Sequence, residues 1–416
     1  MDFPRASLFE GIRFTAQVAV PNVIQGLFRR RRSAVAVATR TGADGLAAGF
    51  MAGLKRSYGD GPVWIRVAKN EALLLLGREP IRRALEGSPD PFAADPEPKR
   101  SAMKHFQPDA LTISRGEDWE DRRRFTEAVL GAVDRDRVVA VCSEQAAALP
   151  ADLDWDAFNR AVRRIARRVI LGDGAADDER LSEMLGELMD KSNPPGRGDS
   201  ELYERYTAAL DRYVDAAEAG SLIGRFGETP VTERTKPAGQ VTHWLFALGD
   251  TLAINAFRCL ALLAAFKPAR TDDEYMDACL HEGMRLWPTT AMLSRETVRD
   301  TDWDGVTVPE GTQLLIVNAF NHRDRDAVPF ADRFEPEAWL SGDAGSDWQF
   351  NHFSHGPQGC PGVELSLLVG RELLRPLLER SPRVASGSLD PRRPIPHSLD
   401  YFGLRFELSR PSAGAV

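Results

Sequence analysis

A single cysteine near the C-terminal end of the chain lies in a glycine-rich loop that leads into an amphipathic segment. The loop has the spacing Phe353-x-x-Gly356-x-x-x-Cys360-x-Gly362. We expect a helix to begin near Val363, where its free amide groups and dipole would stabilise a thiolate. The glycines let the backbone approach a flat partner closely. The alternative is a buried free cysteine beside a turn, whereas a thiolate in this position would be a candidate metal ligand.

The composition is that of a folded protein that does not bind nucleic acid. Of the 416 residues, 43% are hydrophobic and 27% are charged, which is enough material for a large core. The formal net charge of −8 argues against nucleic acid as a partner. The other cysteines, Cys142, Cys259 and Cys279, lack the paired spacing of a zinc site or a disulfide framework. This usage indicates a reducing compartment.

No apolar run reaches the ~18 residues that a membrane-spanning helix needs, and the N-terminus has no basic-then-apolar signal segment. We therefore expect a cytoplasmic protein without a transmembrane segment. Arg29 to Arg32 follow the apolar stretch Val18–Phe28. Two interpretations stay open for them, a solvated helix end and a surface helix that touches anionic lipid.

The spacing of apolar residues predicts a mainly α fold with a small β portion. Helices are expected at Asp44–Tyr58, Trp119–Val133, Trp155–Leu171, Asp178–Met189, Leu202–Ala219, Val241–Phe266, Asp272–Leu286 and Val363–Leu378. Strands are expected at Val63–Val67 and Ala72–Leu76, as a hairpin around Lys69-Asn70, and at Glu296–Val298, Val306–Val308 and Gln313–Val317. Loops are expected at Asn193–Gly198 and Gly220–Gly239. No G-x-G-x-x-G fingerprint follows a strand, so electrons would come from another protein.

Two further motifs precede the cysteine loop. Glu282-x-x-Arg285 places a carboxylate and a guanidinium one helical turn apart, a spacing that an ordinary surface ion pair also has. Asp250-Thr251 follows Gly249 inside the long apolar segment. Glycine weakens a helix interior and a buried carboxylate is costly, so we expect a local opening of the helix at this point. A capping or surface Asp-Thr pair is the alternative.

The chain resembles the cytochrome P450 family, because its motifs occur in the same order as in that family. From the N-terminal side they are the Asp-Thr helix, the Glu-x-x-Arg motif followed by Leu286-x-Pro288, and the cysteine loop. The resemblance implies one triangular catalytic domain over residues 1–416, with heme b between the long central helix and the cysteine loop and its helix. It also implies that Cys360 is the iron ligand, that Glu282 and Arg285 fold the pocket, and that Asp250 and Thr251 deliver protons.

The resemblance assigns further residues to the heme. These are Trp119, Arg123, Arg295 and His355 for the propionates, with Phe353, Gly356, Gly362 and Ala247 around the ring. Three positions depart from the family pattern: Gln358 and Ala338 stand where a cation is expected, and Leu248 where a small residue is. Arg333 is a candidate substitute for the cation missing at Ala338. Arg122 and Arg124 are expected to be solvated.

The implied activity is insertion of one oxygen atom from dioxygen into a largely apolar small organic molecule, in secondary metabolism. Electrons would come from a ferredoxin or flavodoxin with its reductase, and Arg371 and Arg375 are candidates for contact with such an acidic partner. A peroxide-driven heme-thiolate peroxygenase and a non-catalytic heme sensor stay open as alternatives. The resemblance puts these side chains over the heme: Met103, His105, Phe106, Phe246, Leu248, Met292 and Leu293.

Overall fold

The computed structural model describes residues 2–193, 196–386 and 389–409, and most of them are helical, as predicted. Pro194 and Pro195, in the middle of one expected loop, lie outside the described residues. The helices before residue 220 are α1 (Leu8–Phe14), η1 (Thr15–Ala19), α2 (Val20–Gln25), α3 (Arg32–Thr41), α4 (Ala43–Tyr58), α5 (Arg78–Glu86), α6 (Glu97–Met103), η2 (Leu111–Ile113), α7 (Gly116–Gly131), α8 (Arg135–Ala148), α9 (Trp155–Leu171), η3 (Asp173–Ala175), α10 (Glu179–Ser192) and α11 (Ser200–Ala216). The later helices are η4 (Ile223–Glu228), α12 (Pro237–Phe246), η5 (Ala247–Leu252), α13 (Ala253–Phe266), α14 (Asp273–Leu286), α15 (Asn318–Asn321), α16 (Glu337–Leu340), α17 (Asp343–Ser346), α18 (Val363–Glu379) and η6 (Tyr401–Gly403).

The main sheet joins the two strand clusters that the sequence shows separately. Its strands, in spatial order, are β1 (Pro62–Val67), β2 (Asn70–Leu75), β8 (Gln313–Ile316), β5 (Leu293–Thr297) and β3 (Phe92–Ala93). The predicted hairpin forms, with Val63 opposite Leu74, and its turn lies one residue earlier than expected, at Ala68-Lys69. Strand β2 then pairs in parallel with β8, so that Leu74 lies opposite Leu315. The sheet therefore ties the N-terminal part of the chain to the segment that follows α14.

Two smaller sheets complete the β portion of the described residues. One contains β4 (Asp152–Asp154), β10 (Arg405–Glu407) and β9 (Arg383–Ser386), and the other is the hairpin of β6 (Thr301–Trp303) and β7 (Val306–Val308). The sequence predicts β7 but not β4, β6, β9 or β10. Each of the missed strands has only three or four residues, too few to show an alternating pattern.

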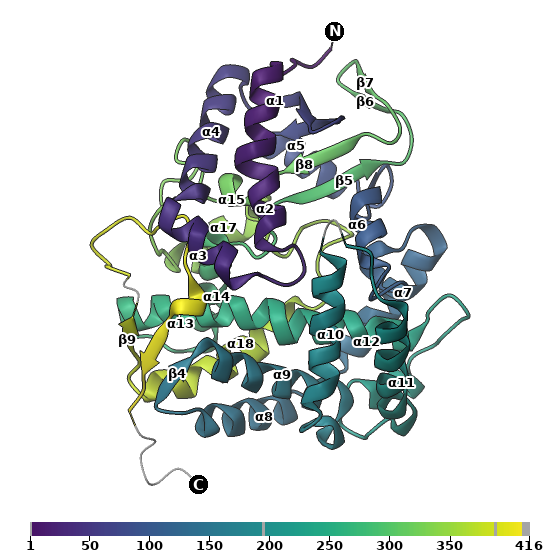
Figure 1. Ribbon diagram of the computed structural model, residues 1–416, viewed down its shortest axis with the longest axis vertical. Coiled ribbons are helices and arrows are strands. Elements are labelled where there is room, and N and C mark those ends of the chain that lie inside the picture. Colours follow the sequence, from purple (N-terminus) through teal and green to yellow (C-terminus); the bar gives the residue numbers. More distant parts are fainter. Residues whose placement is uncertain (1, 194–195, 387–388, 410–416) are drawn as a thin grey trace.

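The long apolar segment forms a continuous helix, α12–η5–α13, across the middle of the molecule, between the sheet-bearing part and helices α8, α9 and α18 (Figure 1). Its central turns, Ala247–Leu252, are π-helical, which is the local opening expected around Gly249. By length and composition the helix Pro237–Phe266 could cross a membrane, contrary to the sequence-based expectation, yet 67% of its most apolar window is buried. It is the core helix of the fold.

The main hydrophobic core surrounds this helix. Phe257 and Leu260 of α13 are fully buried, and they share the core with α9, α14 and α18. Burial of one such side chain contributes about 1.5–3 kcal/mol. Helix α8, which the sequence analysis misses, covers α18 and α9 and buries Val138 and Val141. Its polar residues interrupt the apolar spacing, so the pattern alone does not reveal it.

The basic run Arg29–Arg32 fastens the N-terminal helices to the rest of the protein. Arg29 pairs with Asp190 of α10 at 2.7 Å, and Arg30 donates to the carbonyl of Thr289 at 2.7 Å. Arg29 and Arg30 are thus bound to other segments, whereas Arg31 and Arg32 are exposed, so a wholly solvated helix end does not describe the run and contact with lipid stays a hypothesis. Helices α1, α2 and α4 stand beside the sheet at the end of the molecule opposite α8 and α9 (Figure 1).

Candidate functional site

The Cys360 loop has a fixed backbone that presents the sulfur just before α18. The Cys360 amide donates to the Phe353 carbonyl at 2.8 Å, and the Gly359 amide donates to the Gly356 carbonyl at 2.9 Å. Gly356 has a φ of +70°, and a β-carbon there would lie 2.3 Å from the carbonyl oxygen of Leu85. Both facts require glycine at this position of the motif.

The Cys360 side chain is exposed although protein surrounds it. Burial raises the pKa of its thiol, while the Gly362 amide and the charge of Arg123 lower it. The residue is accessible from outside the protein, yet the thiol is not favoured as an anion by its surroundings alone. An electropositive partner at the sulfur would favour the thiolate, as bound iron does.

The central helix exposes a short face in its otherwise buried length. Phe246, Ala247 and Thr251 are partly exposed, whereas most side chains of the following helix α13 are buried. The acid of the Asp-Thr pair is turned toward α9: Arg163 donates to Asp250 Oδ1 at 2.5 Å, and Asn159 donates to the Gly249 carbonyl at 3.0 Å.

Asp250 and Arg163 line a small cleft of about 270 Å³, open solvent at its mouth included, between α9, α10 and the central helix. Both side chains are 16% exposed. Asp250 is therefore neither the capping residue nor the surface residue of the alternative interpretation. It lies between a solvent-accessible cleft and the Thr251 position, where an acid can pass protons inward.

The Glu-x-x-Arg pair is fully buried and forms the centre of a network. Glu282 accepts two bonds of 2.7 Å from Arg285, whose remaining donors reach backbone carbonyls that include those of His322 and Arg333. A surface ion pair, the alternative for this motif, is thereby excluded.

The cation missing at Ala338 is replaced by neutral donors. Glu282 also accepts from the Trp339 indole at 2.9 Å and from the Glu335 amide at 2.9 Å. The Arg333 side chain is 66% exposed and pairs with Glu335, so only its carbonyl joins the network. The prediction that the Arg333 side chain substitutes is wrong. Trp339 occupies the aromatic position of the motif, but the sequence does not show that its indole contacts Glu282, because this contact depends on the fold.

Arg295 is a buried cation without a carboxylate partner in the described part of the chain. It is 1% exposed, and it donates to Ser88 Oγ at 2.8 Å, the Ser294 carbonyl at 3.0 Å and Ser354 Oγ at 2.9 Å. Burial lowers its pKa to about 10. A desolvated guanidinium held only by neutral acceptors is suited to an anionic ligand.

A second cation, the partly buried Lys99, also lacks a carboxylate partner in the described part of the chain and lies close enough to Arg295 for their charges to interact, and the sequence analysis missed it. The Lys99 amine donates to the Ala94 carbonyl at 2.9 Å and to Thr112 Oγ1 at 2.7 Å, and the Ala94 amide in turn donates to Gln358 Oε1 at 2.9 Å. Burial first, and then the charge of Arg295, lower the pKa of Lys99 to about 7. The Lys99 amine and the side chain of Gln358, where the family pattern has a cation, thus bind the same residue, Ala94.

The remaining residues predicted for the heme are arranged around the same loop. Arg123 donates to the Gly359 carbonyl and, at 2.7 Å, to Glu127, and Trp119 lies one turn earlier on α7. His355 Nε2 lies 3.2 Å from the Phe350 carbonyl, and its ring stacks on Trp348. Together with Arg295 and Lys99, these residues form a set that fits a flat group with two carboxylates.

Phe353 of the loop packs on buried histidines. Its ring centroid lies 5.6 Å from that of His281 and 5.2 Å from that of His352, and the two histidines are hydrogen-bonded at 2.8 Å. Burial lowers the pKa of His281 to about 4 and that of nearby His322 to about 3. These imidazoles are neutral supports of the loop.

The residues expected to line the substrate pocket fall into two groups. Met103, Phe106 and Leu248 are at most 4% exposed, and Phe106 packs edge-on between Phe28 and Phe246, so these side chains belong to the core. The partly exposed ones are His105, Phe246, Met292 and Leu293.

Three arginines differ from the sequence-based expectation. Arg122 is 7% exposed and donates to Ser114 Oγ at 2.7 Å, so it is structural and not solvated; Arg124 is exposed, as expected. Arg371 is 6% exposed and pairs with Asp277 at 2.9 Å, and Arg375 pairs with Glu372 at 3.2 Å. Their charges are neutralised within the chain, and they do not form a free basic surface for an acidic electron donor.

Comparison with known proteins points to one family. The sequence profile described as Cytochrome P450 matches residues 269–380. The chain is 27% identical over 384 residues to cyclooctat-9-en-7-ol 5-monooxygenase of Streptomyces melanosporofaciens, covering 76% of this chain and 81% of that protein. It is 28% identical over 111 residues to cytochrome P450 4c3 of Drosophila melanogaster, covering 26% and 21%. It thus spans only about a fifth of the length of some curated relatives that it matches.

Solved structures share the fold. CYP175A1 from Thermus thermophilus superposes with a TM-score of 0.69 at 18% identity, covering 98% of this chain and 100% of that one. A 6-coordinated cytochrome P450 from another strain of the same bacterium superposes with a TM-score of 0.66 at 19% identity, covering 87% and 98%. At these identities the likeness establishes the fold and not the substrate.

Proposed function

Because the chain belongs to the cytochrome P450 family, we propose that it is a heme-thiolate monooxygenase formed by one catalytic domain over residues 1–416. The observation that carries the proposal is the exposed Cys360 in its hydrogen-bonded glycine loop before α18, together with the buried Arg295, which has no carboxylate partner among the described residues. When bound there, a heme with a thiolate ligand supplies O–O cleavage and an oxidant able to attack C–H bonds.

Cys360 would hold the iron of heme b, and the loop glycines would let the ring lie flat against the backbone. Thr251, on the partly exposed face of the central helix, would hold a proton at its hydroxyl for the chemistry that the heme supplies. Asp250 would take protons from the cleft beside α9 and return them through Thr251. Arg163 holds the Asp250 carboxylate turned toward α9, so that each proton transfer requires this ion pair to loosen.

The heme propionates would be held by Arg295, Arg123, Trp119 and Lys99. Lys99 is the cation that replaces the one missing at Gln358, since the side chains of both residues bond to Ala94. His355 would act on the ring indirectly, by fixing the loop through Phe350.

The Lys99 assignment is tested with Lys99→Met and with Lys104→Met as the control, because Lys104 is an exposed lysine five residues further on. We expect the first variant to lose heme to excess apomyoglobin about tenfold faster than the wild type, and the control to be unchanged. Wild-type heme affinity should fall as pH rises above 7, where the amine with a pKa of about 7 loses its charge. Equal heme loss in both variants would contradict the assignment.

The substrate would be a largely apolar small molecule of secondary metabolism, hydroxylated or epoxidised in the cytoplasm with electrons from a separate ferredoxin or flavodoxin and its reductase. His105, Phe246 and Leu293 would contact it, whereas Met292 lines a separate pocket beside the N-terminal helices. The name of the Streptomyces relative, a 5-monooxygenase, supports the reaction class. A panel of compounds screened by the shift in heme spin state identifies the substrate.

A peroxide-driven peroxygenase would not need Asp250 and Thr251, and the ion pair and cleft around Asp250 favour the monooxygenase. The test compares turnover of a panel compound with ferredoxin and reductase against turnover with hydrogen peroxide alone. We expect product only with the full electron-transfer system. Peroxide alone matching it would identify a peroxygenase, and a panel in which no compound shifts the spin state or yields product would favour a heme sensor.

A further inference from the structure

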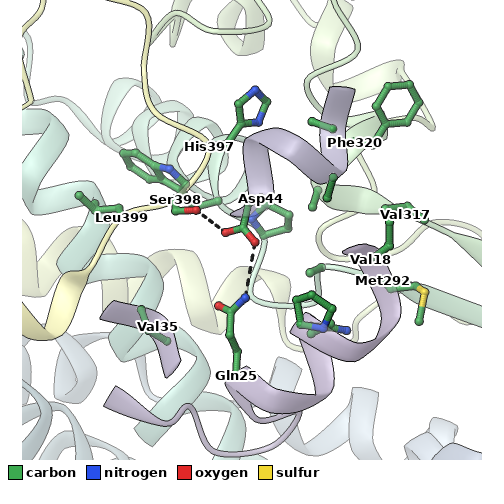
Figure 2. A pocket seen from close by; sticks show the side chains of 18 of the residues that line it. Val18, Gln25, Val35, Asp44, Met292, Val317, Phe320, His397, Ser398 and Leu399 are labelled. Carbon is green, nitrogen blue, oxygen red and sulfur yellow. Dashed lines mark hydrogen bonds between the residues drawn. The ribbon is translucent and has the colours of Figure 1, made fainter. Parts of the chain in front are cut away.

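We propose that a second pocket, between the N-terminal helices and the segment after α14, binds an organic carboxylate whose anionic group lies between Arg30 and Arg258. The pocket is shown in Figure 2. The proposal goes beyond the oxygenase function and does not depend on it.

The pocket is mostly apolar away from its charged groups. The space between its lining residues, open solvent at the mouth included, is about 920 Å³. Val18 and Val35 come from the N-terminal helices, Met292 and Val317 from the strand ends of the main sheet, and Leu399 from the C-terminal segment (Figure 2). A ligand with a hydrocarbon body of several carbons would bury it against these side chains.

Two arginines in the lining have no carboxylate partner among the described residues. Arg30 donates to the Thr289 carbonyl at 2.7 Å, and Arg258 donates to the Trp287 carbonyl at 3.0 Å. The Arg258 guanidinium also lies 4.9 Å from the Tyr401 ring centroid. Burial lowers the pKa of both arginines, that of Arg258 to about 10, and both remain charged at neutral pH. Each guanidinium has five donors, so most are free for a ligand.

The carboxylate in the lining, Asp44, acts on both arginines through its charge but forms no ion pair with either, and other side chains of the lining hold its oxygens. Ser398 Oγ donates to one of its oxygens at 2.5 Å, and Gln25 Nε2 lies 3.5 Å from the other (Figure 2). His397, the remaining titratable side chain of the lining, has its pKa lowered to about 4 by burial and is neutral at pH 7. Two arginines and one aspartate leave the pocket with a net charge of +1.

Unpartnered polar atoms gather in the same lining. Gln17 Oε1, Thr39 Oγ1 and Arg258 Nε are buried atoms without a hydrogen-bond partner among the described residues, and all three residues line this pocket. Each such atom costs free energy in the absence of a partner. A carboxylate would accept from Arg258 Nε and from the Thr39 hydroxyl, and a bidentate fit to a guanidinium gives it preference over a neutral group of the same size.

The test compares octanoate with octan-1-ol, which share the hydrocarbon body and differ in charge. Calorimetric titration of the heme-loaded protein at neutral pH should show octanoate binding at least about tenfold more tightly than octan-1-ol. The variants Arg258→Gln and Arg30→Gln should each lose most of this preference. Arg392→Gln, which removes an arginine whose side chain is 89% exposed, should keep it.

Equal affinities for octanoate and octan-1-ol in the wild type would overturn the proposal, and so would an unchanged preference in both pocket variants. Far-ultraviolet circular dichroism establishes that each variant is folded, and two independent arginine variants guard against the misfolding of one. The carbon monoxide complex of the same protein reports the thiolate ligand separately. Loss of anion binding and failure of the proposed oxygenase function are therefore distinguishable.

Discussion

Replacement of Trp339 by phenylalanine tests whether an indole has taken over the role of an absent arginine. Trp339 Nε1 donates to Glu282 at 2.9 Å, and the Glu282 carboxylate is 0% exposed. Phenylalanine retains an aromatic ring that can stack on His281, as the indole does at 4.8 Å between centroids. The substitution therefore removes mainly one hydrogen bond to a buried charge.

A hydrogen bond to a charged group contributes about 1.5–3 kcal/mol, and the unpaired oxygen cannot be hydrated in this position. We expect Trp339→Phe to lower the free energy of unfolding by about 2 kcal/mol, measured by urea unfolding followed by far-ultraviolet circular dichroism. The matched control is Trp303→Phe, because Trp303 is also buried but donates to the neutral Thr301 hydroxyl at 3.1 Å.

The control should lose about 1 kcal/mol, typical of a neutral hydrogen bond. The reasoning is refuted if Trp339→Phe lies within about 0.5 kcal/mol of the wild type, the usual range of surface substitutions. It is also refuted if the control loses as much stability as Trp339→Phe, because the charge on Glu282 would then have no special effect.

Three further outcomes are expected. Histidine has a pKa near 6.5 in an unfolded chain, whereas the pKa values of His281 and His322 in the folded chain are about 4 and about 3. The free energy of unfolding, measured with denaturant, should therefore be fully present above pH 6.5 and fall by about 2 kcal/mol per histidine between pH 7 and pH 5. Equal free energies of unfolding at the two pH values would contradict this prediction. Asp250→Asn should lower product formation about 100-fold at unchanged spin-state binding, with Asp177→Asn as an unaffected control. Arg163→Gln should change the rate of turnover at unchanged spin-state binding, and an unchanged rate would mean that the ion pair does not restrain the acid.

Patterns in the sequence predicted the long elements well. Trp155–Leu171 is a helix with the predicted bounds, and the opening expected around Gly249 is the π-helical segment η5. Strong apolar periodicity, or a residue with a special backbone cost, carries such information locally. Helix α8 was not predicted, because its polar residues interrupt the helical spacing of the apolar ones. The parallel pairing of β2 with β8 was not predicted either, because it joins segments that are distant in the sequence.

The candidate site was predictable where a motif names the residue and not where the fold supplies it. Cys360 is recognisable from the spacing of the glycines around it. Lys99 belongs to no sequence motif, and only the tertiary structure places it near Gln358 and Arg295. Trp339 likewise replaces an arginine through the geometry of one loop. Compensations of this kind depend on contacts between distant segments, so a single sequence does not reveal them.

The most direct test of the account is the absorption spectrum of the reduced, heme-loaded protein under carbon monoxide. The account predicts the strongly red-shifted band that a thiolate ligand produces, and its loss in Cys360→His with heme still bound. Cys142→Ser, a change at a fully buried cysteine away from the loop, should keep the band. A wild-type complex without the red-shifted band, or a Cys360→His complex that retains it, would contradict the assignment of Cys360 as the iron ligand.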